Sequence, residues 1–222
     1  VQEAQKKGAK VVVIDSYKSR TAKQADWHIE PKPGSDGALA VAIIQHIIYN
    51  NLIDKEYIKN HTNGFDELKE HVKNKDPKWA SKITGIDEDD IKQLAYEMAT
   101  TQPVGIRIGV ALERHHGGGQ TIRAVTCISA LTGSWKFVGG GITQFPVWEH
   151  PYKFDVICRP DFIPKGTRVV NALQIGRALL GENIDKDKPI KSMMCWNANP
   201  VTQATETEKI IQGLKREDLF LV

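Results

Sequence analysis

The sequence predicts an α/β fold, with a mostly parallel sheet covered by helices on both faces, of the kind that binds dinucleotides. Two observations carry this prediction. Short runs of β-branched residues alternate with longer segments of helical periodicity along the chain. The first such run, Val11–Ile14, holds four consecutive β-branched residues and stops abruptly at Asp15, which is typical of a short, fully buried parallel strand.

The first part of the chain is expected to form strands followed by a lobe of helices. Residues 1–7 predict the last turns of a helix that Gly8 caps, and a second short strand is expected over residues 27–31. Ser35 or Asp36 is expected to cap a helix that runs to about residue 50 with its apolar residues on one face. Further helices are expected over residues 54–60, 65–74, 77–81 and 87–100.

The rest of the chain is expected to return to the sheet and then begin a second module. It predicts a strand over 103–109, a glycine-rich loop over 110–119, a helix over 120–132, and glycines 139–141 that end the unit. A second βαβ module is expected from a helix over 169–180, strands over 190–196 and 219–222, and a helix over 205–213. The predicted domains are residues 1–142, a linking excursion over 143–168, and the start of the second module over 169–222.

Composition narrows the classes of function. The chain has 222 residues with 41% apolar residues, and its net charge of +3 is too small to indicate a nucleic-acid partner. No segment approaches the roughly 20 apolar residues of a membrane span. The three cysteines form no CxxC pair, so no metal site is expected within the chain.

A nucleotide pocket is expected where the first strand ends, because ligands of open α/β sheets bind at the carboxyl ends of strands. Its walls would be the loop of Asp15, Ser16, Tyr17, Lys18 and Ser19 and the turn of Gly34, Ser35 and Asp36. A carboxylate accepts two hydrogen bonds from guanine N1–H and its 2-amino group, which makes Asp36 the candidate base contact. The sequence pattern alone favours a plain helix N-cap for Asp36 over the base contact, and the alternative for Asp15 is an NAD ribose contact, although no G-x-G-x-x-G precedes Asp15.

Two later loops carry further candidate ligand contacts. Arg114 is a candidate anion contact because a guanidinium pairs two phosphate oxygens, and the adjacent His115 suits hydrogen bonding better than metal ligation. Asn197 and Asn199 offer donors and acceptors at a strand end to a pterin or nucleotide edge. Their alternative is an Asx turn before a helix.

These segments together resemble a known family. The run from Gly8 to Ala22, Pro33-Gly-Ser-Asp36, Gly139-Gly-Gly141 and Trp196-Asn-Ala-Asn-Pro200 resemble the large subunits of molybdopterin oxidoreductases, the dimethyl sulfoxide reductase and formate dehydrogenase superfamily. The family usually has Asp-Pro-Arg where this chain has Asp15-Ser16-Tyr17, and glycine is common at the position of Asn197. Asn199-Pro200 matches the family pattern.

The resemblance implies a function for a longer parent protein. The cofactor would be a molybdenum or tungsten bis-molybdopterin guanine dinucleotide, with each module holding one half, and the parent would catalyse two-electron redox or oxygen or sulfur atom transfer. A 4Fe-4S cluster and the metal ligand would lie in the parent outside this chain, which we expect to be inactive alone. Implied partners are the remaining parent domains and an iron–sulfur electron-transfer subunit. Alternatives are a non-catalytic iron–sulfur scaffold of the complex I type and an NAD-dependent dehydrogenase.

Overall fold

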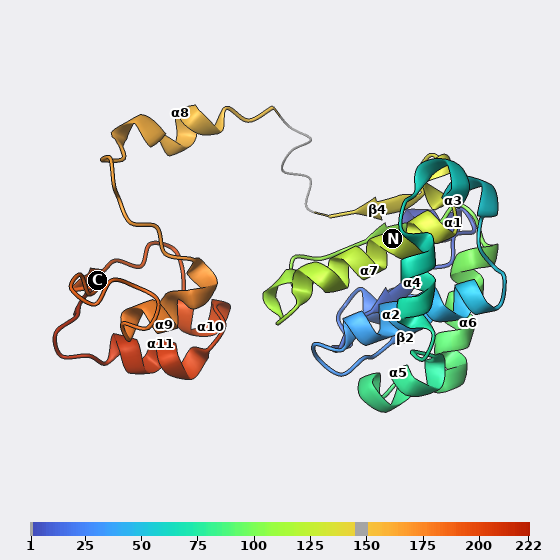
Figure 1. Cartoon of the computed structure of the whole chain (residues 1–222), viewed down its shortest axis with the longest axis horizontal. Helices are drawn as coiled ribbons and strands as arrows, with labels where there is room; N and C mark the ends of the chain where they lie inside the picture. The colour runs from blue at the N-terminus through green and yellow to red at the C-terminus, as the bar shows by residue number, and fades with distance from the viewer. Residues whose placement is uncertain (1, 145–150) are drawn as a thin grey trace. The chain divides into compact units, whose positions relative to one another are not determined.

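The computed structural model describes residues 2–144 and 151–222, and the chain divides into two compact units, Val1–Pro146 and Val147–Val222 (Figure 1). Residues 145–150 of the expected linking excursion lie outside the described residues, and the expected domain boundaries stay predictions. No helix in the described ranges is both long and apolar enough to cross a membrane.

The first unit contains two strand pairs and most of the helices. Its elements are α1 (Gln2–Lys6), β1 (Val12–Ile14), β2 (Trp27–Ile29), α2 (Asp36–Tyr49), α3 (Lys55–His61), α4 (Phe65–Val72), α5 (Pro77–Thr84), α6 (Glu88–Thr100), β3 (Gly105–Arg107), α7 (Gly118–Leu131) and β4 (Gly141–Thr143). The second unit contains α8 (Phe154–Cys158), α9 (Ile175–Leu179), β5 (Ser192–Met193), α10 (Pro200–Gln203), α11 (Thr207–Leu214) and β6 (Phe220–Leu221).

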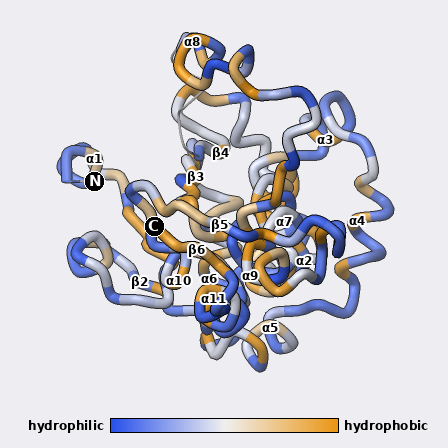
Figure 2. The backbone as a smooth tube through the Cα atoms, turned by 90° about the vertical axis from the view of Figure 1, so that its left-hand side faces the viewer, coloured by the Kyte–Doolittle hydropathy of each residue, from blue (hydrophilic) through white to orange (hydrophobic). Residues whose placement is uncertain are grey.

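All the strand pairs in the described part of the chain are parallel, which confirms the predicted α/β class. β1 pairs with β2, β3 with β4, and β5 with β6. The three pairs are separate and do not form one continuous sheet among the described residues. β6 is hydrophobic along its length (Figure 2), yet Phe220 is 70% exposed.

Several expected elements differ from the observed ones. β1 is not fully buried, since Ile14 is 41% exposed at a strand edge that no other described strand covers. β4 differs from the expectation, because the sequence predicts that Gly139–Gly141 ends the unit, whereas Gly141 begins a strand that pairs with β3. The helix expected from residue 169 begins only at Ile175, because the Asn171 side chain accepts a hydrogen bond from the Leu173 N–H and forms a tight turn first.

The core of the first unit is built around α2. The apolar face predicted for this helix is buried throughout, at Leu39, Ile43, Ile44, Ile47 and Ile48. α2 contacts α4, α5, α6 and α7, so it is enclosed on several sides, and the small residues Ala40 and Ala42 are buried as well. The site-bearing start of α2 is therefore held by the best-packed part of the chain.

Asp54 connects two helices of this unit. Its carboxylate accepts a hydrogen bond of 2.9 Å from the Tyr57 N–H at the start of α3, and it pairs with Lys136 beyond α7. The Lys136 ammonium first, and the Tyr57 N–H second, lower the pKa of Asp54 below its ordinary value. The fold therefore favours the ionised form of Asp54.

Low pH should remove the stability that the ionised Asp54 carboxylate contributes to the fold. A carboxylate with a lowered folded pKa stabilises the fold above its unfolded pKa of about 4, and that stabilisation is lost as the pH falls through the folded value. We expect Asp54→Asn, which keeps a capping oxygen but cannot titrate, to reduce the fall in thermal midpoint between about pH 5 and pH 2. At pH 7 its cost should stay below about 1 kcal/mol, because the pair is partly exposed.

The control for this measurement is Asp66→Asn, which changes an exposed acid in the first turn of α4. Thermal unfolding followed by circular dichroism at several pH values gives the comparison. Equal pH dependence in the Asp54→Asn chain and the unmodified chain would show that Asp54 does not couple stability to pH.

Candidate functional site

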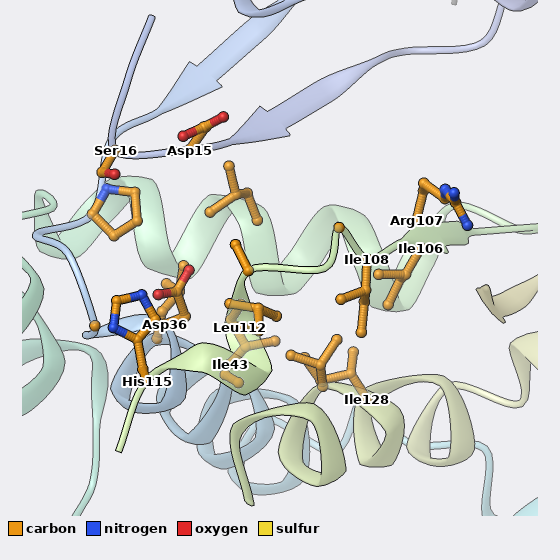
Figure 3. Close-up of a pocket in the computed structure, with 18 of the residues that line it drawn as sticks. Asp15, Ser16, Asp36, Ile43, Ile106, Arg107, Ile108, Leu112, His115 and Ile128 are labelled. Carbon is orange, nitrogen blue, oxygen red and sulfur yellow. The ribbon is translucent and has the colours of Figure 1, made fainter. Parts of the chain in front are cut away.

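A cavity of about 300 Å³ lies in the first unit, beside the carboxyl ends of β1 and β3 (Figure 3). One wall is the end of β1 and its loop, the other is the end of β3 and its loop, and α2 and α7 contribute Ile43 and Ile128. Figure 3 shows a polar end, with Asp15, Ser16, Asp36 and His115, and an end beside β3 whose labelled residues are apolar except for Arg107. Polar side chains that could bind a ligand therefore lie near the carboxyl ends of the strands, where the sequence predicted a pocket.

β1 is held in position from its amino end. The Asp26 carboxylate accepts hydrogen bonds from the Val11 N–H at 2.7 Å and the Gln5 side chain at 3.1 Å, and these lower the pKa of Asp26. Lys10 donates to the Glu97 carboxylate of α6 at 2.6 Å, which lowers the pKa of Glu97. The strand that leads to Asp15 is thus tied to both α1 and α6.

Asp36 is the first residue of α2, and its half-buried side chain lines the cavity. The carboxylate has no hydrogen bond or ion pair with any other residue in the described ranges. Ser35 occupies the N-cap position, but its hydroxyl donates to the Lys32 carbonyl at 2.6 Å and makes no capping bond. Ser35 therefore takes the N-cap position that was expected for Ser35 or Asp36, but without a side-chain capping bond, and the Asp36 carboxylate is left for another partner.

The loop after β1 contributes only part of the expected wall. Asp15 and Ser16 line the cavity, whereas Tyr17, Lys18 and Ser19 do not. One Asp15 carboxylate oxygen accepts from the Tyr17 N–H at 3.1 Å, and the Ser19 hydroxyl accepts from the Ala22 N–H at 3.2 Å. These bonds shape the loop, and they leave Tyr17 71% exposed.

Gly34 and His115 close the polar end from two distant parts of the sequence. Gly34 has φ of +79°, a left-handed conformation that favours glycine. A Cβ atom at Gly34 would lie 3.4 Å from His115 Nδ1, so the imidazole lies directly against the glycine backbone. The His115 ring, and not only a ligand, therefore makes use of the close approach that Gly34 allows.

Arg114 lies in a 3₁₀ turn, Leu112–Arg114, and does not line the cavity. Its Nε donates to the Val110 carbonyl at 3.0 Å. The turn packs on the start of α7 at Gly118, where a Cβ would lie 2.2 Å from the Leu112 carbonyl oxygen. The fold itself therefore requires glycine at position 118, because a Cβ atom there would clash with the 3₁₀ turn.

Asn197 and Asn199 belong to the second unit and follow β5. Asn197 has φ of +50°, a left-handed conformation that asparagine and glycine tolerate best. Asn199 precedes α10, and its backbone N–H donates to Gln203 Oε1 at 3.2 Å, while its side chain makes no capping bond. The proposed Asx turn at Asn199 does not form, so its amide stays a candidate ligand group.

Residue patterns did not reveal the apolar half of the cavity. Ile106 and Ile108 of the β3 segment face it together with Met98 of α6. The alternation Ile106-Arg107-Ile108 is a strand signal, but nothing local indicates which helices complete the wall. No group of three or more histidine, cysteine or acidic residues in the described ranges could hold a metal ion.

Comparison with known proteins places the chain in a family. The molybdopterin oxidoreductase family model matches residues 1–222. The chain is 42% identical to the probable oxidoreductase YoaE of Bacillus subtilis, over 100% of the chain and 32% of YoaE. It is 29% identical to the F420-dependent formate dehydrogenase subunit alpha of Methanocaldococcus jannaschii, over 100% of the chain and 35% of that subunit.

A solved structure supports the fold. Acetylene hydratase from Pelobacter acetylenicus superposes with a TM-score of 0.69 and 24% identity, over 99% of this chain and 35% of the hydratase. The chain thus spans about a third of the length of these relatives. Since the family model covers every residue and a relative shares 42% identity, the chain belongs to the molybdopterin oxidoreductase family.

Proposed function

We propose that the chain is part of a larger molybdenum or tungsten oxidoreductase and that the polar end of its cavity binds the guanine end of a molybdopterin guanine dinucleotide. Membership of the family supports a molybdopterin cofactor. The observation that carries the nucleotide proposal is the half-buried Asp36 carboxylate, which lines the cavity without a partner among the described residues.

Asp36 fits a guanine edge chemically. An ionised carboxylate only accepts hydrogen bonds, and guanine offers N1–H and a 2-amino group side by side. Charge-assisted bonds of this kind are about twice as strong as neutral ones. Adenine presents an acceptor at N1 and would be rejected by the same carboxylate. Asp36 therefore favours guanine over adenine at this end of the cavity.

The neighbouring groups complete a polar rim. Ser16 can donate or accept through its hydroxyl, and His115 can do so through its ring nitrogens. The positive φ of Gly34 turns the backbone sharply just before Asp36. We propose that Asn199 in the second unit serves the other half of the two-part cofactor, and that Arg114 approaches a diphosphate.

The cofactor would supply the electron chemistry, because a metal held by pterin dithiolenes carries out two-electron redox or oxygen or sulfur atom transfer when bound. The residues of this chain would bind and orient its nucleotide ends. A 4Fe-4S cluster, the metal ligand and contacts to an electron-transfer subunit are assigned in this proposal to the remaining parent domains. The chain alone is then expected to be catalytically inactive.

Nucleotide titration tests the guanine site directly in this chain. We expect guanosine diphosphate to bind more tightly than inosine diphosphate, which lacks the 2-amino group, and adenosine diphosphate to bind weakest. Asp36→Asn should weaken guanosine diphosphate binding by about 10- to 100-fold, since a hydrogen bond to a charged group is worth roughly 1.5–3 kcal/mol. Isothermal titration calorimetry measures each constant.

The matched control is Asp66→Asn, an acid in the first turn of another helix, which should leave binding unchanged. In the longer protein, Asp36→Ala should lower molybdenum or tungsten content and the guanine released on hydrolysis. Unchanged metal and guanine in that variant would contradict the role of Asp36. A metal-free parent with intact iron–sulfur clusters would instead indicate a non-catalytic scaffold.

A further inference from the structure

The hydrogen-bond ladder between β1 and β2 lacks a backbone donor at the end that meets the cavity. The Val11 carbonyl accepts from the Trp27 N–H at 3.3 Å. The Asp15 N–H donates to the Ile29 carbonyl at 3.1 Å. In a parallel pair with this register, the N–H of residue 31 would be the next donor, and it would bond the Asp15 carbonyl. Residue 31 is a proline, so the ladder has no N–H to give to that carbonyl.

The side chain of His28 supplies the missing donor. Its Nε2 lies 2.9 Å from the Asp15 carbonyl oxygen. A carbonyl oxygen only accepts, so Nε2 carries a proton and donates it to this bond. His28 is a half-buried residue of β2 and does not line the cavity. A side chain outside the cavity therefore fixes the backbone where the loop of the site begins.

The bond from His28 also sets the direction of the next backbone N–H. The peptide bond between Asp15 and Ser16 is trans, so its C=O and N–H point to opposite sides. The cavity lining includes Ile14, Asp15 and Ser16 but no residue of β2 (Figure 3). Because the Asp15 carbonyl is held toward β2, the Ser16 N–H is directed away from β2, to the side of β1 where the cavity lies.

The Ser16 N–H has no hydrogen-bond partner among the described residues, although its neighbours do. The Tyr17 N–H donates to Asp15 Oδ1 at 3.1 Å, and the Ser19 N–H donates to the Tyr17 carbonyl at 2.7 Å. His28 and the Asp15 carboxylate thus hold the two peptide groups that flank Ser16. The proline of the family's Asp-Pro-Arg would have no N–H at this position, so the donor is a feature of this chain.

We infer that His28 is a positioning residue, which holds the peptide between Asp15 and Ser16 so that the Ser16 N–H donates to an acceptor oxygen of the bound nucleotide. The Asp36 carboxylate in the same cavity only accepts hydrogen bonds, so it cannot serve such an oxygen. A backbone N–H held in place can do so, whether the oxygen belongs to the nucleoside or to its diphosphate. The inference rests on the proposed nucleotide site and adds one donor to it.

Two substitutions of His28 test its hydrogen bond. Methionine and glutamine have side chains of similar length, but only glutamine carries an N–H that can reach the Asp15 carbonyl. We expect His28→Met to weaken guanosine diphosphate binding by about three- to tenfold and His28→Gln to bind within about twofold of the unmodified chain. Calorimetric titration is done well below the thermal midpoint of each variant. The control, His71→Met, changes an exposed histidine of α4 and should leave binding unchanged.

A second pair of variants tests whether His28 acts through the Ser16 N–H. Ser16→Ala and Ser16→Pro both lose the hydroxyl, but only proline loses the N–H, and an Asp-Pro pair is compatible with the start of a turn. Ser16→Pro should bind guanosine diphosphate about tenfold more weakly than Ser16→Ala. Adding His28→Met should weaken binding further in the Ser16→Ala chain and not in the Ser16→Pro chain, because both changes remove the same contact.

Titration with guanosine locates the acceptor oxygen. If His28→Met weakens the binding of guanosine and guanosine diphosphate alike, the oxygen belongs to the nucleoside. If it weakens only guanosine diphosphate binding, the oxygen belongs to the diphosphate. Equal binding by His28→Met and His28→Gln would overturn the inference, and so would equal further losses in the two Ser16 backgrounds.

Asp36→Asn separates this inference from the proposed function. Binding that Asp36→Asn weakens and His28→Met does not would contradict the positioning role alone. Binding that His28→Met weakens and Asp36→Asn does not would contradict the guanine assignment alone. An unmodified chain that does not bind guanosine diphosphate would overturn both.

Discussion

Replacing Ile44 by alanine is expected to lower the free energy of unfolding of the first unit by about 3–4 kcal/mol. The Ile44 side chain is fully buried in the middle of α2, among the helices that surround it. Truncation removes apolar surface from the core and leaves a cavity that close-packed helices fill only partly. Urea unfolding followed by circular dichroism measures the change.

Ile83→Ala is the matched control, because Ile83 is an isoleucine of α5 in the same unit that is 40% exposed. Its replacement should cost less than about 1 kcal/mol. If both variants lose the same stability, α2 is not the centre of the core. Such a result would also remove the main reason for regarding the position of Asp36 as rigid.

Gly118→Ala is expected to change both stability and ligand binding. A Cβ at this position would lie 2.2 Å from the Leu112 carbonyl oxygen and 2.6 Å from the Glu113 Cα, both of which are backbone atoms. The 3₁₀ turn must therefore move away from α7, at a cost of roughly 1–3 kcal/mol. His115 follows this turn, so we expect guanosine diphosphate binding to weaken by about tenfold, which corresponds to roughly 1.4 kcal/mol.

The next residue provides the control. Gly119 is also in the first turn of α7, but a Cβ there would have no atom within 4 Å. Gly119→Ala should leave binding unchanged and raise stability by up to about 1 kcal/mol, because alanine favours a helix more than glycine does. Thermal unfolding and nucleotide titration of the two variants form the comparison. Equal effects of both substitutions would mean that the turn is not packed on Gly118.

Local signals were sufficient for the helices of the first unit and insufficient for the strands. The apolar residues of α2 recur at helical spacing, so the sequence indicated which face is buried. β4 was missed because its only signal is Gly141-Ile-Thr143 after two other glycines, and its strand conformation depends on pairing with β3. Exposure of Ile14 could not be foreseen either, since four β-branched residues in a row predict burial without showing which strands flank them.

Local sequence signals likewise predicted one part of the site and missed another. Strand ends and turn residues predicted Asp15, Ser16, Gly34, Asp36 and His115, and all five line the cavity. The hydroxyl of Ser35 was expected to face a ligand or cap α2, but the turn at Lys32 uses it. Which side chain of a Ser-Asp pair points inward depends on backbone dihedral angles that residue identity alone does not fix. Arg114 and the two asparagines stay predictions.

The exposed apolar strand β6 affects how this chain behaves on its own. Phe220 and Leu221 are exposed in a strand that pairs with β5 on one side only among the described strands. An open edge with apolar side chains is a template on which further chains can add strands, and no charged residue or proline interrupts Leu219–Val222. Purified alone, the chain carries an aggregation-prone end, and solubility would improve most from covering that end rather than from altering the helical core.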